Sequence, residues 1–270
     1  MTHGNSAKSP KTLDKRFRNI AHRGASGYAP ENTMAAFRLA VEMGCTEVET
    51  DTHLSADGEL VLLHDATLDR TTDGTGTPSD YTLDELKQLD AGSWLTPDPG
   101  SPFRWRRDYH GERLITLSEL FAEFGDRLTY HVELKDRAEG IAEAVVDAVR
   151  HFGLKESVFV TDFDRSDLLR RAVSLLSGLR SALAPRQALL ADSVAAIEQA
   201  ATAGHDMLFI AIDDLSEQIV AHGQRLGMEI RAYGVRCKQD VRRAQAVGAD
   251  GMTCNWPDWC SDRVDADSSA

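Results

Sequence analysis

The chain has 270 residues, 42% of them apolar, and carries a formal net charge of −13 at pH 7. A chain of this length and composition can bury a sizeable core, and α/β barrels of this size commonly form one domain. The acidic charge argues against nucleic acid and anionic membrane surfaces as partners, although a local basic site can still bind one phosphate.

The chain ends and the cysteines bear on where the protein works. Segment 1–19 is polar and lacks the apolar core of a signal peptide, and no apolar run reaches 18 residues, so we expect no stable membrane insertion. The four cysteines show no CxxC spacing and are too few to staple the chain, which fits a reduced, cytoplasmic setting. We expect a flexible segment at 1–17, one domain at 18–257 and a flexible tail at 258–270. The oligomeric state stays open.

From residue 18 onward, short β-like runs alternate with helical patterns. We expect barrel strands at 19–22, 46–54, 128–134, 157–163, 179–184, 207–212, 228–235 and 251–255. We expect helices at 32–43, 82–89, 139–152, 166–176, 193–203, 216–226 and 239–247, and one that ends at Phe124 after a cap at Thr116 or Ser118. Eight strands alternating with helices predict an α/β fold of the (β/α)8 TIM barrel type. The alternative is an open doubly wound sheet, but the Gly-rich phosphate loop of that fold is missing.

A β-hairpin interrupts the alternation after the second barrel strand. Asp57-Gly58 lies between two β-like runs, and the return run 60–64 follows too closely for a parallel crossover. With the turn centred between Asp57 and Gly58, His64 should lie opposite Asp51. The hairpin would therefore bring a histidine onto a carboxylate.

Three carboxylates at strand ends form a candidate metal site. The C-terminal ends of the strands carry the functional groups of a TIM barrel. Glu49 and Asp51 are two residues apart and share one face of a strand, and Glu133 lies on the matching face of the next barrel strand. Oxygen ligands of this kind suit one hard divalent ion, Ca²⁺ or Mg²⁺. A lone Glu-x-Asp is more often solvated or paired, but the third carboxylate and the nearby histidines favour the metal.

Two histidines and two cations complete the candidate chemistry. His22 ends the first strand, and His64 folds back toward the carboxylates, so two imidazoles can divide acid–base work at neutral pH. Arg23 can bind phosphate as a fork and Lys135 as a point charge. Together with a divalent ion, these groups predict phosphoryl transfer. The chain has no GxSxG motif, so a serine nucleophile has no support.

These motifs resemble those of the glycerophosphodiester phosphodiesterase family. The resemblance rests on His22-Arg23-Gly24, Pro30-Glu31-Asn32-Thr33, Glu49-Thr50-Asp51, His64-Asp65 with Asp69-Arg70-Thr71-Thr72, and Glu133-Leu134-Lys135. It implies a metal-dependent barrel enzyme of glycerol and lipid metabolism that cleaves a small glycerophosphodiester to sn-glycerol 3-phosphate and an alcohol.

The resemblance also implies a role for each site residue. His22 and His64 would act as acid and base, and Glu49, Asp51 and Glu133 would hold the one divalent metal ion. On the substrate side, the residues would be Arg23 and Lys135 on the phosphate, with Glu31 supporting the mouth.

The second half departs from the family pattern on the wall that would face the glycerol or the alcohol. Asp162-Phe163 stands where Ser-Phe is usual, Tyr233-Gly234-Val235-Arg236 where Trp-Thr-Val-Asn is usual, and Cys254-Asn255 where Thr-Asp is usual. We expect Phe163 and Tyr233 to contact the substrate, whose headgroup stays open.

Two other functions stay open. The irregular stretch 94–111 should make a small excursion over the barrel mouth, and an apolar lid from Trp94, Phe103 and Trp105 would favour lysophospholipids as substrates. A non-catalytic barrel that only binds phosphodiesters should have lost some of the two histidines and three carboxylates, and all five are present. The sequence decides neither which histidine is the acid nor whether a cyclic phosphate forms.

Overall fold

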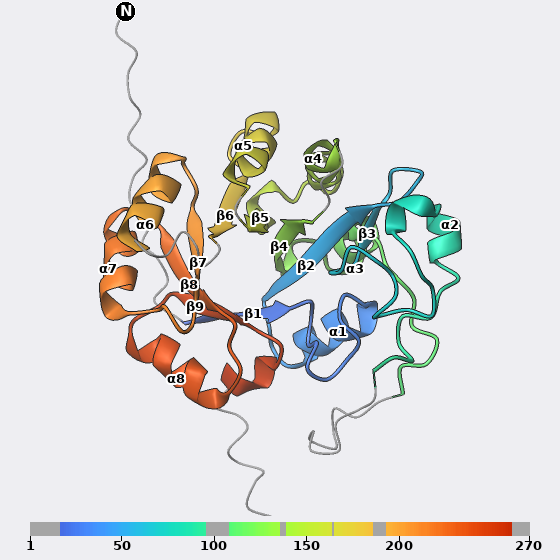
Figure 1. The fold of residues 1–270 in the computed structure, drawn as a ribbon, viewed down its shortest axis with the longest axis horizontal. Helices are drawn as coiled ribbons and strands as arrows, with labels where there is room; N and C mark the ends of the chain where they lie inside the picture. Colours follow the sequence, from blue (N-terminus) through green and yellow to red (C-terminus); the bar gives the residue numbers. More distant parts are fainter. Residues whose placement is uncertain (1–16, 96–107, 136–138, 164, 186–192, 261–270) are drawn as a thin grey trace, which may run out of the picture.

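Eight parallel strands close into a barrel, and the helices lie around its outside (Figure 1). The computed structural model describes residues 17–95, 108–135, 139–163, 165–185 and 193–260. The barrel strands are β1 (Arg18–His22), β2 (Glu47–Leu54), β4 (Thr129–Leu134), β5 (Val158–Phe163), β6 (Arg180–Ala184), β7 (Met207–Ala211), β8 (Glu229–Tyr233) and β9 (Gly251–Cys254). Parallel pairing of β1 with both β9 and β2 closes the ring, which confirms the predicted TIM barrel.

The helices follow the strands in the expected alternation. They are α1 (Met34–Glu42), α2 (Leu83–Leu86), α3 (Leu117–Phe124), α4 (Ile141–Phe152), α5 (Ser166–Leu175), α6 (Ser193–Thr202), α7 (Glu217–Arg225) and α8 (Lys238–Ala246). The Thr33 and Thr116 hydroxyls cap α1 and α3 by accepting from backbone amides that the first turn leaves unpaired. The helix expected at 82–89 is only one turn long, because the backbone tightens to i→i−3 bonds at Gln88 and Leu89.

Alternation along each strand divides the apolar residues between two layers. Val158 and Val160 of β5 belong to the core between barrel and helices, whereas Phe159 belongs to a smaller cluster with Ile20 and Phe209. Neighbouring residues of a strand point to opposite faces, so Phe159, Thr161 and Phe163 share the inward face of β5. The same parity turns Glu47, Glu49 and Asp51 of β2, and His131 and Glu133 of β4, into the barrel.

The base of the barrel interior is filled by charged groups that pair with one another. Arg231 is 1% exposed, and its Nη1 donates to Glu47 Oε2 at 2.7 Å. His131 Nε2 lies 3.0 Å from the same oxygen, and Arg18 Nη1 donates to Glu47 Oε1 at 3.0 Å. Burial alone would raise the pKa of Glu47, but the His131 hydrogen bond and the Arg231 charge lower it well below its ordinary value. This cluster ties β1, β2, β4 and β8 together beneath the mouth.

The hairpin forms, but its register corrects the expectation by one residue. β3 (Leu60–Leu62) runs antiparallel to β2, with Thr52 opposite Leu62. The Leu63 amide donates to the Asp51 carbonyl at 3.1 Å, so Leu63, and not His64, lies opposite Asp51.

The reason for the shift is the loop. The Ser55 amide donates to the Glu59 carbonyl, which leaves three residues in the turn instead of two. Gly58 adopts a φ of +85°, the left-handed residue that a three-residue hairpin loop requires. His64 therefore follows the end of β3 and reaches the barrel mouth from there.

The chain boundaries need one correction. The tail expected from residue 258 begins too early, because Pro257–Cys260 form a 3-10 helix and Asp258 is buried against the Tyr28 hydroxyl, which donates to it at 2.9 Å. The expected flexible segment, apart from Phe17, and most of the excursion, residues 96–107, lie outside the described residues. Among the helices in the described ranges, none combines the length and the apolar character needed to span a membrane.

The charged cluster generates a stability prediction. Arg231→Met should lower the free energy of unfolding by about 3–5 kcal/mol, because it leaves the buried Glu47 charge without its closest cation. Arg38→Met is the control, since Arg38 pairs with Glu123 on the surface and should cost less than about 1 kcal/mol. Urea unfolding of the two variants measures the difference. Equal losses would contradict the assignment of the cluster as a stabilising feature.

Candidate active site

Three carboxylates meet at the C-terminal ends of β2 and β4. Glu49 and Asp51 share the inward face of β2, and the parallel register sets Asp51 beside Glu133 of β4. One carboxylate oxygen from each residue lies within 4.8 Å of the others, and all three side chains are buried. The spacing of oxygens is one that a single cation can bridge. The structure thus brings together the three residues that the sequence singled out.

Repulsion between like charges destabilises the fully ionised form of this trio. Burial raises the pKa of Glu133 to about 8, with repulsion from Asp51 as the next cause, and burial with the same repulsion raises the pKa of Glu49. The pKa of Asp51 is lowered, because Arg23 and Lys135 outweigh the effect of its burial. Asp51 Oδ1 is buried and accepts no hydrogen bond from the described residues. A divalent cation bound between the three would relieve the repulsion and satisfy this oxygen, so the donor set fits a metal.

Arg23 is held against the carboxylates by its own backbone. Its φ of +55° lies in the left-handed region, which a non-glycine residue adopts only when surrounding contacts hold it there. Here the Arg23 amide donates to Glu49 Oε2 at 3.0 Å, and Nη1 donates to Glu31 Oε1 at 2.9 Å. Nε lies 3.4 Å from Asp51 Oδ2. The guanidinium is therefore fixed at the edge of the carboxylate trio.

Lys135 approaches the same trio from the end of β4. Its Nζ lies 2.8 Å from Glu133 Oε1 and 3.5 Å from Asp51 Oδ1. The two cations that the sequence assigned to phosphate thus flank the candidate metal site, within reach of an anion bound there.

His22 is oriented by a residue from the far end of the chain. Its Nδ1 lies 2.6 Å from Asn255 Oδ1, and its Nε2 lies 3.8 Å from Glu49 Oε2. Burial, and then the charge of Arg23, lower the pKa of His22 below its ordinary value. A neutral imidazole that donates from Nδ1 to Asn255 leaves the Nε2 lone pair free on the side of the carboxylates.

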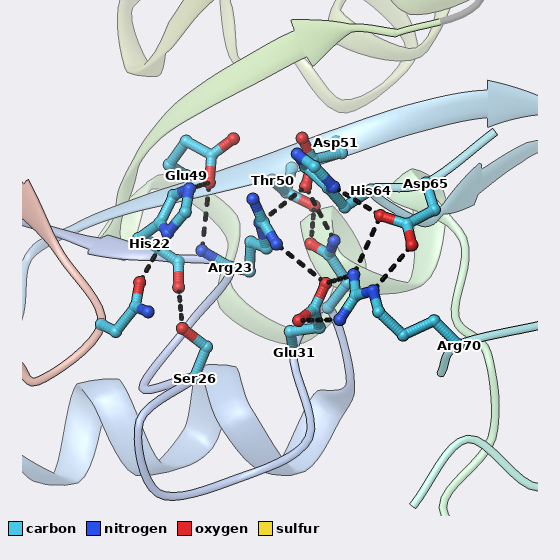
Figure 2. A network of polar contacts seen from close by, with 12 residues as sticks. His22, Arg23, Ser26, Glu31, Glu49, Thr50, Asp51, His64, Asp65 and Arg70 are labelled. Carbon is cyan, nitrogen blue, oxygen red and sulfur yellow. Dashed lines mark hydrogen bonds and ion pairs between the residues drawn. The ribbon is translucent and has the colours of Figure 1, made fainter. Parts of the chain in front are cut away.

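His64 is oriented by a carboxylate that an arginine holds in turn (Figure 2). His64 Nδ1 lies 2.7 Å from Asp65 Oδ1, and Arg70 Nε donates to Asp65 Oδ2 at 2.6 Å. Arg70 also donates to both oxygens of Glu31, at 2.7 and 2.9 Å. The hydrogen bond from Arg70 is the main reason that the pKa of Asp65 is far below its usual range. Glu31 is shared between Arg70 and Arg23, so contacts run unbroken from His64 to the metal trio.

Three residues of the site were not predicted from the sequence: Arg70, Asn255 and Asn32. Asn32 donates from Nδ2 to Asp51 Oδ2 at 2.9 Å and so orients a candidate metal ligand. Asn255 follows the last barrel strand, at the position where the other site residues were sought, and that placement was a usable signal. Arg70 belongs to a motif that carries the family resemblance, Asp69-Arg70-Thr71-Thr72, but its spacing after Asp65 did not indicate a role in the site.

A pocket of about 450 Å³ opens beside the trio. His22, Arg23, Glu49 and Glu133 line one side, and the ends of β5 to β9 line the other. Phe163 and Tyr233 stand perpendicular to each other on that wall, with ring centroids 5.7 Å apart. Asp162 also reaches the wall, where Arg165 Nε donates to it at 3.0 Å. His64 is not among the lining residues, so the two histidines approach the trio from different sides.

Comparisons with known proteins match nearly the whole chain. The model of the Glycerophosphoryl diester phosphodiesterase family matches residues 22–259. A Caldanaerobacter subterraneus subsp. tengcongensis protein named glycerophosphodiester phosphodiesterase is 33% identical over 243 residues, which are 88% of this chain and 94% of that protein.

Solved structures agree with that match. A phosphodiesterase from Oleispira antarctica, in complex with the product sn-glycerol-3-phosphate, gives a TM-score of 0.73 at 28% identity and covers 92% of this chain and 97% of its own. A glycerophosphodiester phosphodiesterase from Agrobacterium tumefaciens gives 0.74 at 27% identity, with 91% and 99% covered.

The repulsion within the trio generates a second prediction. Glu49→Gln keeps an acceptor for the Arg23 amide and removes one buried charge. A carboxyl whose pKa rises on folding destabilises the fold as the pH increases above its ordinary pKa, so the variant should gain stability at pH 8 and lose that gain near pH 4.5. We expect the melting temperature in chelator at pH 8 to rise by roughly 2–4 °C, and the further rise on adding Ca²⁺ or Mg²⁺ to shrink.

The control for this variant is Glu143→Gln, which removes a charge paired with Arg171 on the surface and should change neither quantity. A Glu49→Gln protein that melts no higher than the original at pH 8 would show that repulsion does not strain the trio.

Proposed function

Because the chain belongs to the glycerophosphoryl diester phosphodiesterase family and is an enzyme of that class, we propose that it hydrolyses small glycerophosphodiesters to sn-glycerol 3-phosphate and an alcohol. The observation that carries this proposal is the convergence of three carboxylates, Arg23 and two histidines, with His22 on the pocket side of the trio and His64 on another side. The product held by the Oleispira antarctica relative supports the choice of product.

Glu49, Asp51 and Glu133 would hold one divalent cation, Ca²⁺ or Mg²⁺. When bound, such an ion supplies Lewis-acid polarisation of a phosphate oxygen and offsets the charge of the diester. The protein's part is to hold the three carboxylates close together and aligned. Asn32 contributes by donating to Asp51, and the strand register contributes by fixing Glu133 beside it.

Arg23 and Lys135 would bind the non-bridging phosphate oxygens. A guanidinium can donate two parallel hydrogen bonds to a phosphate, and an ammonium adds a point charge. Both side chains are partly exposed toward the mouth and already lie beside the trio. Their positions would stabilise the charge that builds up on phosphorus oxygens in the transition state.

The partners of the two histidines suggest how they divide the proton transfers. His22 has a neutral acceptor at Nδ1, so its Nε2 is available to accept the proton of the attacking oxygen. His64 has the carboxylate of Asp65 at Nδ1, which orients the ring, and its Nε2 would act as the acid that protonates the leaving alkoxide. The attacking oxygen is either water or a neighbouring hydroxyl of the substrate.

Glu31 would act through other residues and not by touching the substrate. Both its oxygens are engaged by Arg23 and Arg70, which leaves it to position the phosphate-binding guanidinium. Phe163 and Tyr233 would instead contact the substrate directly, because they form the aromatic wall of the pocket.

The histidine roles generate a third prediction. His22→Ala and His64→Ala should each lower kcat by about 10²–10⁴-fold, the usual contribution of general acid–base catalysis, and leave the melting temperature nearly unchanged. His151→Ala, an exposed histidine of α4, is the matched control and should keep full activity. Initial rates of glycerophosphocholine hydrolysis measure the loss. Turnover near that of the original protein in either variant would remove that histidine from the mechanism.

The metal and the substrate class generate a fourth prediction. Release of sn-glycerol 3-phosphate from glycerophosphocholine should stop after treatment with a chelator and return on adding Mg²⁺ or Ca²⁺. Full activity after exhaustive chelation would contradict the metal assignment. Hydrolysis of lysophosphatidylcholine but not of glycerophosphocholine would replace the proposed substrate class. No hydrolysis of either diester with either metal would favour a non-catalytic barrel.

A further inference from the structure

A tryptophan that the proposed chemistry does not use lies behind His64. The Cζ of Arg70 lies over the Trp94 ring, 5.9 Å from the ring centroid. Arg70 is the residue that holds the Asp65 carboxylate in place against His64. Trp94 was a candidate for an apolar lid from the sequence, but it is not among the described residues that line the pocket. Its neighbour is instead a cation that orients the partner of a proposed catalytic histidine.

Two carboxylates occupy the plane of the Arg70 guanidinium (Figure 2). Nε and Nη2 donate to Asp65, at 2.6 and 3.0 Å, and Nη1 and Nη2 donate to Glu31, at 2.9 and 2.7 Å. These bonds use four of the five N–H groups of the side chain. The two flat faces of the guanidinium stay available for other contacts, and Trp94 covers one of them.

An indole over a guanidinium stabilises it in two ways. The electron-rich face of the ring attracts the cation, and the ring keeps water away from one side of the ion pairs. The Arg70 side chain is 43% exposed, so water competes for its hydrogen bonds. Removing the ring should therefore loosen the pairs that Arg70 makes with Asp65 and Glu31, although every donor and acceptor stays in place.

Trp94 is itself held by an ordered turn. Its Nε1 donates to the Ala91 carbonyl at 2.9 Å, which restricts rotation of the ring. The Asp90 carboxylate accepts from the Ser93 amide at 2.8 Å, just before Trp94. It also accepts from the Gly111 amide at 2.9 Å, from the other flank of the excursion.

The turn that carries Arg70 is bonded directly to the turn that carries Trp94. Asp73 follows Arg70 by three residues, and its carboxylate accepts from the Asp90 amide at 2.8 Å. The Asp73 amide donates in return to the Asp90 carbonyl at 3.1 Å. These reciprocal bonds hold the two turns together, so the indole is kept over the guanidinium.

We propose that Trp94 is a positioning residue for His64, acting through Arg70 and Asp65. The contacts run from the indole face to Arg70, from Arg70 to Asp65 by two hydrogen bonds, and from Asp65 to His64 Nδ1 at 2.7 Å. The proposal rests on the proposed function and adds to it a residue that acts from outside the pocket. Loss of the ring impairs the proton transfer by His64.

Two substrates with different leaving groups separate this role from a general loss of structure. Glycerophosphocholine releases a strongly basic alkoxide, which needs a proton from a general acid. The p-nitrophenyl ester of sn-glycerol 3-phosphate releases a nitrophenolate, which leaves without one. The values of kcat and KM are measured on both substrates for the original protein, for Trp94→Leu and for Trp94→Phe. Both variants lose the donor to Ala91, and only phenylalanine keeps an aromatic face.

Trp94→Leu should lower kcat on glycerophosphocholine by about three- to tenfold, the size expected for a partly exposed cation–π contact. It should lower kcat on the nitrophenyl ester by less than about twofold. KM should change little on either substrate, because Arg23 keeps its contacts with Glu49 and Asp51. Trp94→Phe should retain most of the original rate.

Double variants trace the effect to His64. In a His64→Ala background, Trp94→Leu should not lower the remaining rate on glycerophosphocholine further, because the group that it positions is gone. In a His151→Ala background, where both proposed catalytic histidines are present, it should keep its full effect. If Trp94→Leu does not fold, Trp94→Met takes its place with the same expectations, since a flexible methionine fills gaps in packing.

Several outcomes would overturn the proposal. Equal losses of kcat on the two substrates would make the indole a structural support only. A Trp94→Phe protein as slow as Trp94→Leu would exclude the ring face, and an effect that persists undiminished beside His64→Ala would exclude action through His64. Unchanged kcat in Trp94→Leu overturns this proposal alone. If the original protein hydrolyses neither substrate, the proposed function itself fails, which separates the two results.

Discussion

Mutual repulsion among Glu49, Asp51 and Glu133 is the constraint on which the rest of the site depends. The parallel strand register brings the three carboxylates together in a buried place, where water cannot solvate their charges. Three neighbouring groups compensate the negative charge of the trio: Arg23 and Lys135 lie beside it as cations, and Asn32 donates a hydrogen bond to Asp51. The left-handed backbone of Arg23 serves the same purpose, because it directs the Arg23 amide toward the Glu49 carboxylate.

A chain of ion pairs connects the trio to His64. Glu31 holds Arg23 with one oxygen and shares both oxygens with Arg70, and Arg70 fixes the carboxylate that orients His64. His22 sits outside this chain of ion pairs and relies on a neutral amide. The two imidazoles therefore have different partners at Nδ1, a charged one and an uncharged one, and this difference suits the opposite proton transfers that we propose for them.

The sequence predicted those parts of the site that follow from the two-residue period of a strand and from the common edge at which parallel strands end. Glu49 and Asp51 share a face because a strand has a period of two, and Glu133 joins them because parallel neighbours end at one edge. The hairpin register was wrong by one residue, because loop length depends on the left-handed conformation of Gly58 and not on spacing alone. Asn255 meets His22 across 233 residues and Arg70 meets Glu31 across 39, and no local pattern encodes such pairings.

The buried Arg231–Glu47 pair has a consequence for protein engineering. Arg231 lies two residues before Tyr233 on β8, so the buried ion cluster lies beneath the side of the mouth that carries the aromatic wall. The proposed reaction groups belong to or follow β1, β2, β3 and β4, whereas the aromatic wall comes from β5 and β8. Libraries at Phe163, Tyr233 and Thr253 can therefore vary the pocket wall while the proposed reaction groups and the Arg231–Glu47 cluster stay constant, which makes this fold a favourable starting point for directed evolution of binding preference.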